Sequence, residues 1–343
     1  FRRRAAFAVA AAAVALISAL ATGLARALTH REIARVSAIG SSIDAFDRDG
    51  RRLWSFAIPG RAHHLPRRQT QLIDLNGNGR VDALVTTSVA ANPEDAGIGR
   101  LYAISDNGEL LWERSLDTRL TFGAGDFEAP WQPDDLLAFT NGGEPLTAWA
   151  VHHHTWWPSI LTVFDARGVR LGAFAQSGWI RSARASADGL HIITGGFSNS
   201  RNGAAFAVLD ARAPTGASPE DAGSPYECRN CPAGQPQRYF TVDWSDIATS
   251  LPPDERDAVV AVYPGRGTIE LRAVQRRSVD LIVELSPSFE IAKRSVSDAF
   301  WESHRRLEKN GTLAHGRDAC PYRNGPIVHE WTPSGGWRTH GAE

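Results

Sequence analysis

The sequence has no excess of charge of either sign. Its 343 residues carry 37 Lys and Arg against 38 Asp and Glu, for a formal net charge of −1. Nucleic-acid-binding domains usually carry a basic excess gathered on one face. The charge balance therefore argues against a nucleic-acid partner. A chain of this length can bury a large core, as one big domain or two ordinary ones.

Common catalytic and nucleotide-binding motifs are also missing. There is no Gly-x-Ser-x-Gly nucleophile elbow, no P-loop, and no dinucleotide fingerprint followed by a helix. Carboxylates do gather in the segments 125–128 and 133–135. However, surface loops are often rich in acids, so no acid–base pair can be assigned from them. The sequence therefore predicts a protein that is not an enzyme and binds no nucleotide.

Charge is absent from one long segment, the 21 residues from Ala5 to Ala25, which follow Arg2, Arg3 and Arg4. At about 1.5 Å per residue, a helix of this length spans the roughly 30 Å hydrocarbon core of a bilayer. A cleaved signal peptide is the alternative, but its apolar region is usually shorter, about 7 to 15 residues. We predict an uncleaved anchor in the bacterial inner membrane, with a cytoplasmic N-terminus and a periplasmic main domain. Because the chain begins with Phe1, we expect further residues to precede it.

Cysteine is scarce, and its pattern excludes two kinds of site. Cys228 and Cys231 form a Cys-x-x-Cys unit, and Cys320 stands alone. Three cysteines cannot make a four-cysteine zinc site, and Pro232 stands where haem c attachment requires His. We therefore expect no haem. In an exported domain we expect one disulfide, either Cys228–Cys231 or one of that pair with Cys320, and the spacing does not decide between them.

Glycine, proline and tryptophan are abundant, with 31, 19 and 11 copies, which favours a turn-rich β architecture. An apolar strand, a turn ending in Gly, and a second strand recur around Gly50, Gly108 and Gly168. An Asp side chain and a glycine with positive φ together suit a tight hairpin. The segments 205–216 and 281–294 look like decayed copies of the same unit.

Further strand-like runs lie between these hairpins, so that each unit of roughly 50 to 60 residues holds about four short strands. Repeated four-stranded units predict an all-β fold, a β-propeller of about five blades, or six. A pair of β-sandwiches would not explain the near-constant hairpin spacing. The predicted parts are a transmembrane anchor (1–27), a linker (28–35), the propeller (36–295), and a C-terminal helix with an extended arm (296–343).

Oxygen-bearing side chains alternate in the segment 72–85, LIDLNGNGRVDALV, at Asp74, Asn76, Asn78 and Asp82. Short oxygen side chains at such spacing can surround one hard cation, and the peptide carbonyl of Arg80 can add a ligand. The alternative is a turn held by Asx hydrogen bonds without an ion.

This segment resembles the calcium loops of integrin-type FG-GAP propeller blades, in which Asp-x-Asp-x-Asp-Gly-x-x-Asp joins two strands. The resemblance is strict over residues 72–85 and loose for the blade architecture. It implies a structural Ca²⁺ held by Asp74, Asn76, Asn78, Arg80 and Asp82. Amides replace two of the family's carboxylates here, which lowers the expected affinity.

The run VHHHTWWPS at 151–159 is a second candidate site. His152 and His154 would share one face of a strand, and with His63 and His64 they suggest zinc or copper. The run offers no carboxylate at ligand spacing, and no helical His-Glu-x-x-His motif exists. Packing of His and Trp at a propeller face or an interface is therefore the favoured interpretation.

Two further resemblances concern the whole domain. Leu-Trp pairs at 53–54 and 111–112 resemble the motif of quinoprotein dehydrogenase propellers, but in too few copies to imply that activity. The His-Trp run, the hairpins and the YECRNCP…RYF segment are similar to uncharacterised membrane-anchored bacterial propeller proteins. That similarity implies no catalytic residues.

The predicted function is a membrane-anchored accessory subunit that stabilises a bacterial membrane-protein complex from its periplasmic side. The anchor helix, the propeller surface and the C-terminal arm would contact the other subunits, and Trp-rich surfaces suit such contacts. A photosynthetic reaction centre–light-harvesting complex is the suggested example, although the anchor has no His to ligate a bacteriochlorophyll. The alternatives are a periplasmic propeller enzyme, hydrolase or quinoprotein-like oxidoreductase, and a ligand-sensing propeller.

Overall fold

The computed structural model describes residues 32–64, 68–90, 97–153, 157–249, 256–275 and 279–341. In this part of the chain the fold is all-β, with two short helical segments near its C-terminal end, α2 (Asp246–Thr249) and α3 (Asp298–Lys309). The all-β prediction is thus confirmed. The predicted anchor lies outside the described residues, and within them no helix is long and apolar enough to cross a membrane.

The strands of the described residues form four larger antiparallel sheets, together with one small hairpin. The first sheet holds β1 (Arg35–Phe46), β2 (Arg52–His64), β3 (Thr70–Ile73), β4 (Asp82–Ala90), β5 (Ile98–Ile104) and β6 (Leu110–Ser115). The second sheet holds β9 (Trp131–Asn141), β10 (Glu144–His153), β11 (Ser159–Phe164) and β12 (Arg170–Gln176). The small hairpin between them is β7 (Leu120–Phe122) and β8 (Gly125–Phe127).

The other two sheets follow in the second half of the chain. The third sheet holds β13 (Gly178–Ala185), β14 (His191–Ser198), β15 (Gly203–Asp210), β16 (Arg238–Asp243), β21 (Val328–Thr332) and β22 (Gly336–His340). The fourth sheet holds β17 (Arg256–Tyr263), β18 (Thr268–Gln275), β19 (Val279–Leu285) and β20 (Ile291–Val296).

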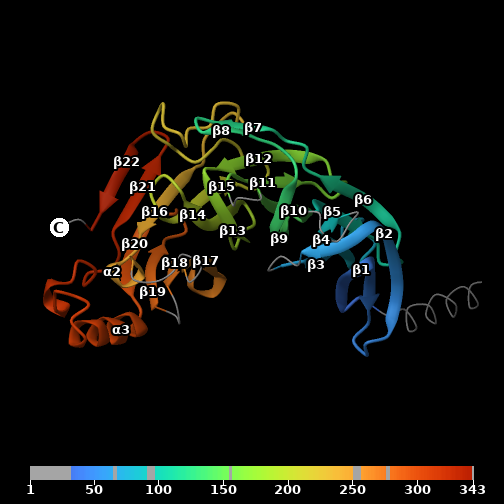
Figure 1. The fold of residues 1–343 in the computed structure, drawn as a ribbon. Helices are drawn as coiled ribbons and strands as arrows, with labels where there is room; N and C mark the ends of the chain where they lie inside the picture. Colours follow the sequence, from blue (N-terminus) through green and yellow to red (C-terminus); the bar gives the residue numbers. More distant parts are fainter. Residues whose placement is uncertain are drawn as a thin grey trace, which may run out of the picture.

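The sheets are arranged one after another along an open arc, with β1 and β2 near one end and β19 with α3 near the other (Figure 1). In the part of the chain that the structure describes, each sheet packs on the next one, but no strand of the first sheet packs extensively on a strand of the fourth. The described strands therefore do not form the closed ring of five or six blades that the hairpin spacing predicted. One reason is local: the β1–β2 hairpin pairs with β4 through Arg61 and Ala62, and so joins the first sheet instead of starting a separate blade.

The predicted turn glycines lie in hairpin turns. Gly50, Gly108 and Gly168 join β1 to β2, β5 to β6, and β11 to β12, with φ of 79°, 90° and 74°. In each turn the glycine N–H donates to the carbonyl three residues earlier, at Asp47, Ser105 and Asp165. Gly in this left-handed conformation avoids the cost that a Cβ would add.

The two segments that look like decayed copies of the hairpin unit, 205–216 and 281–294, have different structures. The segment 281–294 does form a hairpin, β19–β20, in which Phe289 takes the glycine position with φ of 62°. The segment 205–216 does not, because the Asp210 carboxylate accepts the N–H groups of Arg212 and Ala213 and the chain leaves the sheet after β15. Another copy of the turn, from Ser186 to Gly189 between β13 and β14, was not predicted.

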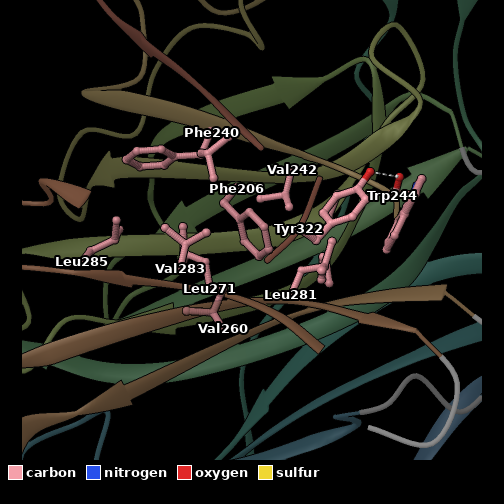
Figure 2. Close-up of a cluster of buried hydrophobic side chains, with 14 of the residues drawn as sticks. Phe206, Phe240, Val242, Trp244, Val260, Leu271, Leu281, Val283, Leu285 and Tyr322 are labelled. Atoms are coloured by element: carbon pink, nitrogen blue, oxygen red, sulfur yellow. Dashed lines mark hydrogen bonds between the residues drawn. The ribbon is translucent and has the colours of Figure 1, made fainter. Parts of the chain in front are cut away.

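Apolar side chains pack between neighbouring sheets, and the largest cluster lies between the third and fourth (Figure 2). Phe206 and Phe240 come from the third sheet, and Leu271 and Val283 from the fourth; all four are fully buried. Tyr322, from the segment after α3, joins this cluster and donates its hydroxyl to the carbonyl of Trp244 at 3.3 Å (Figure 2). The C-terminal segment is thus part of the core.

The predicted C-terminal helix is present, and the arm that follows it forms a hairpin of two strands. Helix α3 begins after Ser297, whose Oγ accepts the Phe300 N–H at 3.3 Å. The chain then returns to the third sheet, where β21 pairs antiparallel with β16 and β22 pairs with β21. Trp331 and Trp337 pack against the core of that sheet. β16 has an edge at which another strand can pair, and the tail carries apolar side chains. The tail therefore pairs with β16 as a strand.

Candidate functional site

The predicted calcium loop connects β3 to β4, and its side chains make the turn themselves. Asp74 accepts the N–H of Gly77 with one carboxylate oxygen and that of Gly79 with the other, both at 2.8 Å. The amide oxygen of Asn76 accepts the Asn78 N–H at 3.0 Å, and that of Asn78 accepts the Arg80 N–H at 2.8 Å. These are Asx hydrogen bonds, which replace the ladder bonds that a tight connection loses.

Asp82 is the buried member of the loop. Its carboxylate is fully shielded from solvent and accepts the N–H of Leu75 at 2.9 Å and that of Asp106 at 3.0 Å. Burial raises the pKa of Asp82, while these N–H donors oppose the rise by stabilising the charged form. Asp82 thereby ties the loop to the β5–β6 turn.

Asp106 makes two more bonds to the loop. Its carboxylate accepts the side-chain amide of Asn78 at 3.2 Å and pairs with the Arg80 guanidinium at 3.1 Å. The loop and the β5–β6 turn thus form one unit. The sequence did not single out Asp106, although it lies in an Asp-Asn-Gly turn. No local pattern indicates that this turn contacts Asp82, 24 residues earlier in the chain.

The donor set fits calcium only in part. Ca²⁺ takes about six to eight oxygen ligands, and the loop offers two carboxylates, two amide oxygens and one peptide carbonyl. The Arg80 guanidinium beside Asp106 adds a positive charge next to the loop. The carboxylate oxygens of Asp74, Asp82 and Asp106, all described residues, do not all lie within 4.8 Å of one another. Hydrogen bonds alone account for the turn, and calcium stays a prediction.

Two residues of the histidine run, His152 and His153, lie on opposite sides of β10. His152 is buried, with Nδ1 2.6 Å from the buried carboxylate of Asp134 and its ring 5.2 Å from that of Trp179. Burial raises the pKa of Asp134, and the hydrogen bond with His152 opposes that rise. His153 instead packs on Phe127, with ring centroids 5.4 Å apart. His154 and the side chains of His63 and His64 lie outside the described residues.

The cysteine pair lies in the long connection from β15 to β16. Cys228 and Cys231 are joined as a disulfide, and Cys320 is a buried thiol. This connection lies against the rest of the fold. Backbone bonds hold it along the β7–β8 hairpin, from Gly123 to Glu227 and from Arg229 to Thr121. These bonds satisfy polar backbone groups that would otherwise need water.

Two tryptophans connect successive hairpin turns in the same way. Trp54 Nε1 donates to the carbonyl of Asp106 at 3.2 Å, and Trp112 Nε1 donates to that of Ala166 at 2.9 Å. Each indole lies on the following turn glycine, since a Cβ added at Gly108 or Gly168 would stand 2.9 or 2.7 Å from ring atoms of Trp54 or Trp112. The Leu-Trp pairs noted in the sequence therefore serve as contacts between consecutive units of the fold.

No protein-family model matches the chain, and no curated protein matches it. Among solved structures, it is similar to the Dos1 propeller with a TM-score of 0.43 and 12% identity, over 88% of this chain and 66% of that one. A hydrazine synthase of Kuenenia stuttgartiensis gives 0.35 and 10%, over 88% and 89%. The V. cholerae biofilm matrix protein Bap1 gives 0.33 and 9%, over 71% and 60%. Likeness at these values carries no argument about function.

Proposed function

We propose that the protein is a non-enzymatic accessory subunit, anchored in the bacterial inner membrane by residues 1–27 with its all-β domain on the periplasmic side. The observation that carries this proposal is the uncharged run from Ala5 to Ala25 behind three arginines. A run of this length and composition suits a single membrane span.

The described side chains of the sequence motifs support a structural role over a catalytic one. Asp74 and Asp82 hold a turn, His152 is buried against Asp134, and Trp112 docks one hairpin on the next. A catalytic acid or base must instead reach a substrate from an accessible position. These residues are fixed by contacts inside the protein.

The surface that we propose for partner binding follows the outer strands of the first two sheets. Leu110 and Leu111 on β6, and Val169 and Leu171 around the start of β12, are exposed by 37 to 51%. They come directly after the turn glycines of two hairpins that Trp112 joins. Exposed apolar side chains near a strand that ends a sheet are a common basis for association.

Purification in mild detergent tests the proposal. A tagged full chain, isolated from membranes of its natural host, should migrate with integral membrane proteins in a large complex on native gels. The photosynthetic reaction centre–light-harvesting complex is tested by recording bacteriochlorophyll absorption in the same band. Release of the protein into the soluble fraction, or a free monomer with hydrolase or dehydrogenase turnover, would contradict the accessory role.

A pair of surface variants sharpens this experiment. Leu110→Glu with Leu111→Glu should reduce the yield of the complex while the free protein keeps its melting temperature, because both side chains are on the surface. The matched control is Ile39→Glu, at a side chain 72% exposed on β1 and outside the proposed surface. Equal losses in the two variants would refute this choice of surface.

A further inference from the structure

Three side chains with metal-binding atoms meet in the C-terminal region, apart from the loop and motifs described above. His304 lies on α3, His315 in the connection that follows, and Cys320 directly after the 3₁₀ turn η3 (Arg317–Ala319). One ligand atom from each, a ring nitrogen of each His and the Cys sulfur, lies within 4.8 Å of the other two. The spacing His-x₁₀-His-x₄-Cys gave no recognisable motif in the sequence.

His304 is fully buried, and its ring nitrogens lack hydrogen-bond partners among the described residues. The Glu308 carboxylate stands 3.9 Å from Nδ1, which is too far for a hydrogen bond. Buried polar atoms are nearly always paired, and an unpaired one costs free energy. A bound ion would satisfy a ring nitrogen.

Cys320 and Asp246 complete the set of candidate ligands. Cys320 is 3% exposed and forms no disulfide in the structure. Asp246, at the start of α2, places Oδ2 3.2 Å from His315 Nε2. A carboxylate beside a metal-bound His is a common arrangement, since it fixes the ring and raises its basicity.

We propose that His304, His315 and Cys320 bind a transition-metal ion of the zinc type, with the Asp246 carboxylate as the fourth ligand or as the partner that orients His315. Two imidazoles, a thiolate and a carboxylate are the ligand types of tetrahedral zinc. A copper site with the same nitrogen and sulfur ligands usually adds an axial Met, and this sequence has no Met.

The surroundings suit a structural ion. Zinc ligand atoms at about 2.0 to 2.3 Å from the ion are roughly 3.3 to 3.8 Å apart, so ligand atoms within 4.8 Å of one another need to close by at most about 1.5 Å. The rings of Trp301 and Phe300 lie 5.5 and 6.3 Å from the His304 ring and shield the site. A cavity of about 800 Å³, lined in part by Cys320, lies next to the cluster.

An ion here would join parts of the chain that meet only in the folded protein. It would link α2, α3 and the segment that leads to Tyr322 and then to β21. Metal binding at ligands that are far apart in the unfolded chain stabilises the folded state directly. The expected role is therefore to hold the C-terminal segment on the third and fourth sheets.

Cobalt substitution tests the site in the full chain. After removal of metal with EDTA, the detergent-solubilised protein should bind one Co²⁺ and show both tetrahedral d–d absorption and a thiolate-to-cobalt charge-transfer band. Zn²⁺ should displace Co²⁺ and raise the melting temperature. Cys320→Ala should remove the charge-transfer band, and His304→Ala should abolish stoichiometric binding.

Controls separate binding from folding. His315→Ala changes a partly exposed side chain, so it should keep the native circular dichroism and lose the metal response even if His304→Ala does not fold. His329→Ala, whose ring contacts Thr339 and Asp243 instead, should bind Co²⁺ as the wild type does. Wild-type protein that takes up no Co²⁺, or uptake that is unchanged in Cys320→Ala and His315→Ala, would overturn the proposal.

Discussion

Individual aspartates in this protein have different roles according to their burial. Asp74 is partly exposed and holds a turn by accepting two N–H groups, whereas Asp82, eight residues later, is fully buried and connects that turn to the next hairpin. Both belong to the same sequence pattern. The pattern shows that oxygens alternate, but only the fold determines which oxygen faces solvent.

Removal of calcium should reveal whether the loop holds an ion. If it does, EGTA should lower the melting temperature of the full chain, because an ion bound only to the folded state contributes about 2.7 kcal/mol at a hundredfold excess over its Kd. Asp74→Ala should abolish this effect, measured by differential scanning fluorimetry. EGTA also chelates zinc, so His315→Ala is the control and should keep the response to added Ca²⁺. No shift in the wild type would leave a hydrogen-bonded turn without an ion.

Asp135 on β9 should make stability depend on pH. Its carboxylate is 2% exposed, accepts the Ala183 N–H at 2.8 Å and lies 3.5 Å from the Arg184 guanidinium. Burial is the largest effect and raises its pKa above the ordinary 3.8. Between 3.8 and the folded pKa the folded protein therefore holds a proton that the unfolded chain has lost, so stability falls as the pH rises through that window.

The matched variant is Asp135→Asn, which keeps an acceptor for Ala183 and does not titrate. The melting temperature of the wild type relative to this variant should be highest below pH 3.8 and should decline as the pH rises above that value, until it levels off above the folded pKa. Circular dichroism melts over that range measure the difference. A relative stability that increases with pH would show that Arg184 and Arg68, which lies 3.9 Å from the carboxylate, outweigh burial.

At the scale of elements, the contacts between hairpins matter more than the hairpins themselves. An isolated two-stranded hairpin is at best marginally stable, and here Trp54 and Trp112 each pack on the next turn glycine. In the following hairpin, Gly172 occupies the position equivalent to that of the two tryptophans. A Cβ at Gly172 would lie 2.3 Å from the carbonyl oxygen of Pro214. The docking by tryptophan thus ends at the second sheet.

Replacing a turn glycine should separate conformational strain from this docking. Gly168→Ala places a Cβ 2.7 Å from the Trp112 ring, whereas Gly142→Ala, at φ of 60°, has nothing within 4 Å. Both variants bear the cost of a left-handed Ala, about 1 to 2 kcal/mol. Only Gly168→Ala should lose a further ~1 to 3 kcal/mol from overpacking, measured by urea unfolding. The double variant with Trp112→Ala should relieve that extra loss, and equal losses at the two glycines would refute the docking.

For the whole molecule, the C-terminal residues close part of the structure that an open arc of sheets leaves exposed. The β21–β22 hairpin covers the edge of β16, and Val328 is fully buried there. A long uncovered strand edge invites pairing with other chains. The tail therefore protects the third sheet in addition to lengthening it.

Truncation after Ile327 should test this protection. It removes β21 and β22, and we expect a lower melting temperature and aggregation at concentrations where the full chain stays monodisperse by light scattering. Trp337→Ala is the milder control, because it removes one ring that packs 6.1 Å from Tyr239 but keeps the strand pairing. A truncated protein with unchanged melting temperature and dispersity would show that the tail is dispensable.

The sequence by itself determined the local structures. Turn chemistry at Gly50, Gly108 and Gly168, a cap at Ser297, and the alternating oxygens at 74–82 depend on neighbours within a few residues. Such features follow from backbone conformation and short-range hydrogen bonds. The all-β class follows from their repetition.

Only the tertiary structure decided how distant segments meet. Four contacts join segments whose proximity no sequence pattern predicts. They are the pairing of β2 with β4, the tail strand on β16, the contact of Asp106 with the loop, and the meeting of His304 with Cys320. Strand edges are chemically alike, so which edges pair depends on packing of the whole chain. That is why the repeat predicted strands and turns correctly but did not predict four sheets along an open arc.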